Sequence, residues 1–330
     1  MPTLRELFDS LSPPAGPPAS AAHFSAHPVP GYEAHRIAKD GEGNPCLLLH
    51  VVGGTTYAVP PPIVLSHLAV QHDVLCRISR PPQAPEESSF TLLRCLGGNT
   101  ALVALFLDVM ELVVRTVGRA PSVDQVRHTV EELAELFQSL DRPTRKSVQG
   151  VWAELFLMAE AGGPGRLAAA WHRVPGEAFD FSEGPERIEV KAATGGARQH
   201  HFSLMQVHPP RGVRVFVASL FVEALAGGTP VKSLLGALRG RLAARPELAL
   251  RVESVTAQTL GRSWESAIEE PFDWERAHES LRFFESHRIP SVARELPSEV
   301  SDVRFRSDLS GLAGLSIGEA RQHGGLFAAL

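Results

Sequence analysis

Residues 179–194 read FDFSEGPERIEVKAAT, a stretch in which a tight turn separates two strand-like segments. The SEGP turn predicts a hairpin centred near Gly184. In that register Asp180 lies opposite Glu189. Directly opposed residues of an antiparallel pair have Cβ atoms about 4.5–5.5 Å apart, where two like charges destabilise the sheet. We therefore expect a cation to offset the repulsion between these two carboxylates.

The second strand-like segment alternates with a period of two. Ile188 and Val190 alternate with Glu189 and Lys191, so one face is apolar and the other carries both charges. Asp180, Glu189 and Lys191 are therefore predicted to converge on one patch. A solvated polar face on an amphipathic strand is the commonest cause of such alternation, and both interpretations stay open at this point.

These three side chains suit phosphodiester hydrolysis. Carboxylate oxygens are hard ligands for Mg²⁺ or Mn²⁺, which polarises a phosphate oxygen and lowers the pKa of a bound water. The ammonium of Lys191 would stabilise charge on the phosphoryl oxygens or hold the attacking water. It does so as a compact point charge, which the planar guanidinium of arginine would not reproduce.

A further acid, Glu154, lies within GVWAELFLMA among apolar neighbours. The helix expected over about 144–161 is apolar on most of its circumference and is predicted to be buried. A lone carboxylate in such a helix is costly unless it is paired or coordinates a metal. Glu154 therefore either serves the same site or lies on a narrow solvent-exposed side of the helix.

Positive charge gathers after the hairpin, although the formal net charge of the chain is −5. A negative chain does not coat nucleic acid through bulk electrostatics, so any contact must be local. Within residues 187–215, Glu189 is the only acid, against Arg187, Lys191, Arg198, Arg211 and Arg214. This segment is either a phosphate-facing surface or an ordinary basic face.

Two neighbouring histidines, His200 and His201, lie in an extended segment near 198–203. Neighbours in a strand point to opposite faces, so both cannot easily bind one ion, and we expect a phosphate-binding or structural role for one of them. Ser203 and Gln206 match a capping box, so Gln206 either caps a short helix or contacts the catalytic site. The candidate nucleic-acid contacts are Arg187, Arg198, His200 and His201.

The cysteines at 46, 76 and 95 are widely spaced without a C-x-x-C pair, which supports neither a disulfide framework nor a structural zinc site. A reducing cytoplasm is the expected location. The N-terminus has no apolar core of a secretory signal. The most apolar run, at 101–114, contains two acids and is too short to span a bilayer, so no membrane association is expected.

The patterns along the chain change from β to helical and then become mixed. Residues 11–30 are Pro- and Ala-rich and are interpreted as a tether, followed by short strand-like runs. Asn99 is expected to cap a helix over 101–117, and a capping box at Ser122 opens a second helix. A continuous apolar run at 213–222 predicts a fully covered central strand.

Glu154 on a helix, then Asp180, then EVK at 189–191 resembles the PD-(D/E)XK nuclease superfamily in order and placement. The run from GVWAEL through FDF, IEVKAAT and RQHHFSLMQV is similar to a bacterial family known only by that motif. Members of that family occur in phage-defence operons beside helicase-type ATPases. The resemblance covers about residues 145–225. Phe179 replaces the proline of the motif, a position that varies widely across the superfamily.

The resemblance implies a role for each matching residue. Its catalytic set corresponds here to Glu154, Asp180, Glu189, Lys191 and Gln206. Asp180 and Glu189 would bind the metal together with the backbone carbonyl of Val190. Lys191 would be the catalytic lysine. Glu154 would be an auxiliary acid, and Gln206 an accessory residue of the site.

We therefore predict an α/β protein with a restriction-endonuclease-like core, a mixed central sheet flanked by helices, at residues 99–225. A β-rich region precedes it at 1–98, and an α/β extension follows at 226–330. The predicted function is Mg²⁺- or Mn²⁺-dependent cleavage of DNA in anti-phage defence, beside a helicase-type ATPase. A non-catalytic subunit that binds DNA or acts as a scaffold is the alternative, and RNA cleavage a third possibility. Opposed carboxylates favour the enzyme, because a scaffold has no reason to hold them.

Overall fold

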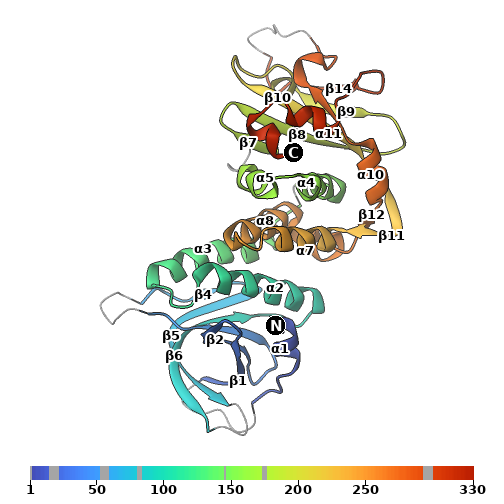
Figure 1. The fold of residues 1–330 in the computed structure, drawn as a ribbon. Helices are drawn as coiled ribbons and strands as arrows, with labels where there is room; N and C mark the ends of the chain where they lie inside the picture. Colours follow the sequence, from blue (N-terminus) through green and yellow to red (C-terminus); the bar gives the residue numbers. More distant parts are fainter. Residues whose placement is uncertain are drawn as a thin grey trace. The chain divides into compact units, whose positions relative to one another are not determined.

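The protein has a mixed α/β fold that divides into two compact units, Met1–Pro143 and Thr144–Leu330 (Figure 1). The computed structural model describes residues 2–14, 22–52, 59–79, 84–144, 146–172, 177–292 and 300–330. The helices at 100–139 belong to the same compact unit as the N-terminal strands, because most of their contacts lie within that unit. The predicted division into three parts, at residues 1–98, 99–225 and 226–330, stays a prediction.

A six-stranded sheet dominates the first unit, whose N-terminal region is β-rich as predicted. The sheet has the order β1-β2-β3-β6-β5-β4 and closes on itself through a parallel pairing of β1 with β5. Its strands are β1 (Ala22–Val29), β2 (Tyr32–Lys39), β3 (Pro45–Leu49), β4 (Ile63–Val64), β5 (Leu68–Ser79) and β6 (Glu86–Cys95).

The tether predicted at 11–30 is wrong at its C-terminal end, because β1 begins at Ala22. Phe24 and Ala26 of this strand are buried, so it alternates as a strand should despite its Ala- and Pro-rich composition. Residues 15–21 of the predicted tether lie outside the described residues.

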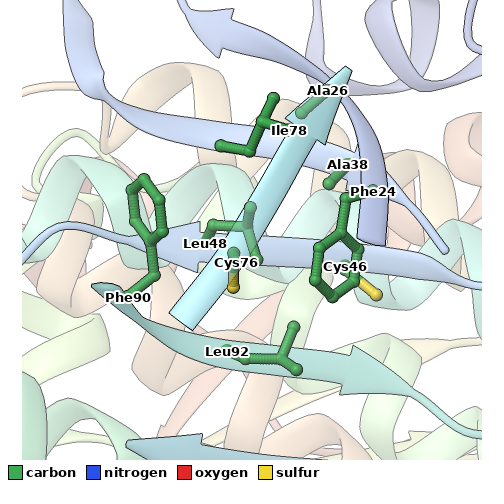
Figure 2. Close-up of a cluster of buried hydrophobic side chains, with 9 residues drawn as sticks. All are labelled: Phe24, Ala26, Ala38, Cys46, Leu48, Cys76, Ile78, Phe90 and Leu92. Carbon is green, nitrogen blue, oxygen red and sulfur yellow. The ribbon is translucent and has the colours of Figure 1, made fainter. Parts of the chain in front are cut away.

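The core of the closed sheet is apolar. Figure 2 shows side chains from several strands meeting inside it, namely Phe24, Ala26, Ala38, Cys46, Leu48, Cys76, Ile78, Phe90 and Leu92. The cysteines are buried as free thiols. Burial raises the pKa of the Cys76 thiol to about 11, which keeps it protonated and unreactive.

The described part of the first unit also contains the helices α1 (Leu4–Asp9), α2 (Thr100–Val117) and α3 (Val123–Ser139). The predicted caps are confirmed, because Asn99 accepts a hydrogen bond from Leu102 N and Ser122 forms a capping box with Gln125. No helix within the described ranges is long and apolar enough to cross a membrane.

A four-stranded mixed sheet forms the centre of the second unit, in the order β13-β10-β8-β7. Its strands are β7 (Phe181–Glu183), β8 (Glu186–Ala193), β10 (Arg214–Phe221) and β13 (Arg282–Glu285). β8 and β10 run parallel, and the two outer pairings are antiparallel. The apolar run at 213–222 is confirmed as a central strand, buried along nearly all of β10.

Helices α4 (Val148–Glu160) and α5 (Pro164–Ala170) lie between this sheet and a second pair, α7 (Val231–Arg241) and α8 (Pro246–Leu260) (Figure 1). The burial predicted for the helix at 144–161 is confirmed, since residues 151–158 of α4 are all buried. Smaller elements are β9 (Gln199–Ser203) paired with β14 (Arg304–Asp308), β11 (Ala224–Pro230) paired with β12 (Pro271–Phe272), α6 (Leu204–Val207), α9 (Trp264–Ala267), α10 (Trp274–Ser280) and α11 (Ile317–Arg321).

Candidate metal centre

The β7–β8 hairpin has the predicted register. Phe181 pairs with Ile188 and Glu183 pairs with Glu186, so one step beyond the paired residues Asp180 comes opposite Glu189. Gly184 closes the turn at a φ of +53°, a conformation that glycine adopts without the steric cost of a Cβ. The sequence therefore predicted the local geometry that brings the two carboxylates together.

Asp180 is held in place from both sides. Its Oδ2 accepts a hydrogen bond of 2.7 Å from the backbone N–H of Val190, and its own carbonyl accepts one of 2.9 Å from His172 N. The side chain is buried, with 3% exposure. Burial and the nearby Glu154 raise the pKa of Asp180.

Glu189 and Lys191 share one face of β8, as their spacing predicts, and Lys191 Nζ lies 2.7 Å from Glu189 Oε1. This face is not solvated at Glu189, which is only 5% exposed, so the solvated-face interpretation is wrong for this residue. The other carboxylate oxygen, Oε2, is buried without a hydrogen-bond partner in the described part of the chain. Burial and the charge of Asp180 raise the pKa of Glu189 to about 8.

Glu154 projects from α4 and is also buried, at 2% exposure, so the alternative of a solvent-exposed side is wrong. Its Oε2 accepts a 2.7 Å hydrogen bond from Trp171 Nε1 and lies 2.9 Å from His172 Nε2. Burial by itself would raise the pKa of Glu154, but Lys146 and His172 outweigh it and lower the pKa to about 2.

Lys146 is the centre of this cluster. Its Nζ lies 2.6 Å from Glu154 Oε1 and 2.5 Å from Asp180 Oδ1, so one ammonium bridges two buried carboxylates from different elements. Its Nζ is also 3.4 Å from His172 Nε2. Burial opposes its charge, but the two carboxylates outweigh burial and raise the pKa of Lys146. The ammonium is therefore charged at any physiological pH.

Lys146 and His172 were missed by the sequence reasoning. One signal could have found Lys146, because the chain has only four lysines and this one stands eight residues before the buried Glu154. His172 follows directly after the short helix α5 and Trp171, and nothing in its local sequence distinguishes it from a surface histidine.

The donor atoms suit a divalent cation. Glu154, His172 and Asp180 each offer one ligand atom, and these atoms all lie within 4.8 Å of one another. Glu189 Oε2, which has no hydrogen-bond partner among the residues that the structure describes, is a second observation that fits a cation nearby, since a buried carboxylate oxygen is costly without a partner. The metal set expected from the motif, Asp180, Glu189 and the Val190 carbonyl, stays a prediction.

A family model described as "Putative PD-(D/E)XK family member" (DUF4420) matches residues 5–310. The chain belongs to this family. The resemblance that was noticed at residues 145–225 is thereby confirmed and extends over both units. No match was found among curated proteins or among solved structures.

In this PD-(D/E)XK family member, Gln206 has the capping role that the sequence left open. Its Oε1 accepts a hydrogen bond from Ser203 N and its Nε2 donates one to Ala178 O, at 3.1 and 3.0 Å. The same side chain lines a cavity of about 690 Å³ with Lys191 and His201. Gln206 therefore both caps α6 and forms part of the wall beside Lys191.

The four candidate nucleic-acid contacts lie in different surroundings. His201 is exposed and lines the cavity. His200 is 3% exposed and 2.8 Å from Ser219 Oγ. Burial and the charges of Lys191 and Arg198 lower the pKa of His200 to about 4. It is therefore neutral at pH 7. The opposite faces expected for the two histidines are confirmed.

The two arginines of the candidate set make contacts within the second unit. Arg198 donates hydrogen bonds to the carbonyl and hydroxyl of Ser219 and to the carbonyl of Ser280. Arg187 donates to the carbonyls of Gly184 and Glu186, at 2.7 and 2.8 Å. A role of these four residues in binding nucleic acid stays a prediction.

Proposed function

We propose that the protein is a metal-dependent nuclease that hydrolyses phosphodiester bonds of DNA. Its catalytic centre would be formed by Asp180, Glu189 and Lys191, on a restriction-endonuclease-like core within the second unit. One observation carries the proposal: a hairpin holds two opposed buried carboxylates beside a lysine that lines a cavity, and one carboxylate oxygen has no hydrogen-bond partner among the described residues. Membership of a PD-(D/E)XK family supports it, since that superfamily consists mostly of metal-dependent nucleases.

Each residue would have a separate task in this reaction. Asp180 and Glu189 would hold Mg²⁺ or Mn²⁺ together with the carbonyl of Val190; when bound, such a cation polarises a phosphate oxygen and acidifies a water. Lys191 would stabilise negative charge on the phosphate with its ammonium, which lies at the wall of the cavity. Glu154 would act as an auxiliary acid and Gln206 as an accessory residue.

The cavity beside Lys191 is where we propose that the DNA backbone approaches. Its wall includes Lys191, His201 and Arg304, which offer positive charge or hydrogen-bond donors to a phosphate. The exposed side chain of Met205 lies on the same wall and offers an apolar contact. We further propose a role in anti-phage defence, in which the protein works beside a helicase-type ATPase.

The test is cleavage of plasmid and linear DNA in the presence of Mg²⁺ or Mn²⁺. Wild type is compared with Asp180→Ala, Lys191→Ala and the matched control Lys232→Ala. Lys232 is exposed and pairs with Glu269, so its loss should leave cleavage unchanged. We expect both site variants to lose cleavage. Cleavage that survives both substitutions would contradict the assignment of the site.

A second outcome decides between the enzyme and its main alternative. If wild type cleaves neither DNA nor RNA with either metal, even with the partner ATPase present, the proposal fails. The protein would then be a non-catalytic subunit that binds DNA or serves as a scaffold. If it cleaves RNA alone, the chemistry holds and the proposed substrate is wrong.

A further inference from the structure

The ribbon formed by β9 and β14 has two faces of different chemistry. The two strands, of five residues each, pair antiparallel, so alternate side chains share a face. One face is apolar, and its Phe202 and Phe305 pack with Val217 and Phe284 of the central sheet. The opposite face is polar and mostly exposed, and it carries Gln199, His201, Ser203, Arg304, Arg306 and Asp308.

Both ends of the ribbon are tied by backbone hydrogen bonds. At one end Leu204 N donates to the carbonyl of Val303, at 3.1 Å. At the other end Leu309 N donates to the carbonyl of Arg198, at 2.9 Å. The polar face therefore sits on a backbone that is already fixed, and a ligand bound there would pay little for ordering it.

The polar side chains of this face hold one another across the two strands. The Arg306 guanidinium donates to Gln199 Oε1, and Gln199 Nε2 donates to Asp308 Oδ2 at 3.0 Å. Asp308 Oδ1 accepts a hydrogen bond of 2.8 Å from Ser310 N. The guanidinium of Arg306 is thus oriented through the facing strand, and a guanidinium has further N–H donors for a ligand.

Positive charge on this face is nearly balanced by acids. Asp308 lies in the same array as Arg306, and Asp302 Oδ1 lies 3.6 Å from Arg304 Nε. A surface that binds phosphates alone gathers uncompensated positive charge. This face instead combines arginine, amide and carboxylate groups, which are the partners of guanine, adenine and cytosine edges in the major groove.

We propose that the polar face of the β9–β14 ribbon enters the major groove of duplex DNA, where Arg306 binds a guanine and sets a sequence preference. The groove is about 12 Å wide and admits a two-stranded ribbon. Among the described residues no third strand pairs with β9 or β14. The inference rests on the proposed function, because it names the feature of DNA that the nuclease centre would act beside.

The ribbon lies next to the proposed catalytic lysine. Lys191 Nζ is 5.4 Å from the centroid of the Phe202 ring, and Arg304 lines the same cavity as Lys191. Arg306 follows two residues later on the same face, about 7 Å farther along β14. Arg304 is therefore placed to contact the phosphate backbone near Lys191, while Arg306 reads a base edge a short distance away.

The test is a selection of bound sequences from randomised duplex DNA by full-length protein without divalent metal. The affinities for the selected duplex and for a scrambled duplex of equal composition are then measured by fluorescence anisotropy at several salt concentrations. Arg306→Ala should lower the preference for the selected duplex by about tenfold or more, because a bidentate contact to guanine is lost. Its affinity for the scrambled duplex should stay within about twofold of wild type.

Three further variants separate base reading from charge. Arg306→Lys keeps the charge without the planar fork and should lose the preference as well. Arg304→Ala should weaken both duplexes alike and lower the slope of log affinity against log salt by about one. Arg127→Ala is the matched control and should change neither quantity, because Arg127 is an exposed arginine of the first unit that pairs with Asp124. Thermal melting checks that each variant is folded.

A sequence preference that survives both Arg306 substitutions would overturn the inference. Recovery of no preferred sequence by wild type would do the same, as would equal weakening of both duplexes in Arg306→Ala, which would make Arg306 a phosphate contact. Cleavage with Mg²⁺ or Mn²⁺ is scored separately. Cleavage without a sequence preference contradicts this inference alone, and a preference that depends on Arg306 without any cleavage contradicts the proposed function alone.

Discussion

The core of the closed sheet and the cluster around Glu154 are both buried, but they are built from opposite chemistry. Phe24, Leu48 and their neighbours remove apolar surface from water, which stabilises the fold. Glu154, Asp180 and Glu189 place carboxyl groups in the interior, where an ionised carboxylate costs free energy unless partners compensate. Buried ionisable groups gather preferentially at functional sites, so these three buried carboxylates support the proposed metal site.

Two buried polar side chains of the first unit, His35 and Asp40, differ from Glu189 in their hydrogen bonding. His35 accepts a hydrogen bond from His50 N, and Asp40 accepts two from the backbone of its own turn, at Glu42 and Asn44. These groups are satisfied by nearby backbone. Glu189 instead retains a buried oxygen without a partner among the described residues. Asp40 thus closes a turn of the first unit, whereas Glu189 lies in the candidate site of the second unit.

The largest effect is expected from an apolar truncation in the first unit. Phe24→Ala should lower the free energy of unfolding by about 3–5 kcal/mol, because it leaves a cavity in the closed sheet. The loss should be the same at pH 5 and pH 8 and should not be relieved by Mn²⁺. Denaturant titrations measure it, with Phe24→Leu as the milder control. If the loss of unfolding free energy in Phe24→Ala depended strongly on pH, the two regions would not differ in the way described.

A pH dependence is expected from the second unit. The pKa of Glu189 is raised from an ordinary 4.5 to about 8 in the folded protein, so folding favours its protonated form. Its contribution to stability is complete below pH 4.5 and is lost as pH rises toward 8, by up to about 1.4 kcal/mol per pH unit.

Glu189→Gln, which cannot titrate, should remove this part of the pH dependence. The difference in unfolding free energy between wild type and this variant, measured from pH 4 to 9 without metal, isolates the effect. Parallel curves for the two proteins would show that Glu189 titrates normally.

The smallest effect comes from a matched pair of aliphatic truncations. Ile78→Val in β5 and Ile188→Val in β8 each remove one buried methyl group and should each cost about 0.5–1.5 kcal/mol. Only Ile188→Val should also slow DNA cleavage, because β8 carries Glu189 and Lys191. Equal cleavage rates in the two variants would mean that the packing of β8 does not position the site.

The parts of the fold that follow local rules were predictable from sequence. The capping boxes at Ser122 and Ser203, the hairpin register and the apolar strand β10 depend on short-range patterns, and each is present. β1 was missed because Ala and Pro obscured its alternation. The closure of the sheet was out of reach as well, since the pairing of β1 with β5 joins segments that no local pattern connects.

Some residues of the candidate site were likewise predictable from local patterns, and others were not. Asp180, Glu189 and Lys191 lie on one hairpin, so strand periodicity could bring them together. Lys146 and His172 reach the cluster from segments 34 and 8 residues away from Asp180, through the packing of α4 and α5. A lysine between two buried carboxylates is a tertiary feature, and periodicity carries no information about it.

We propose that the buried carboxylates of the second unit serve metal-dependent cleavage. The most direct test of this proposal compares wild type with Glu189→Gln in two measurements, metal-free stability at pH 8 and single-turnover cleavage of linear DNA with Mn²⁺. The variant should be at least as stable as wild type, while its cleavage rate falls by about a thousandfold, as for loss of a group that stabilises the transition state. A destabilised variant that cleaves DNA at the wild-type rate would contradict the proposal.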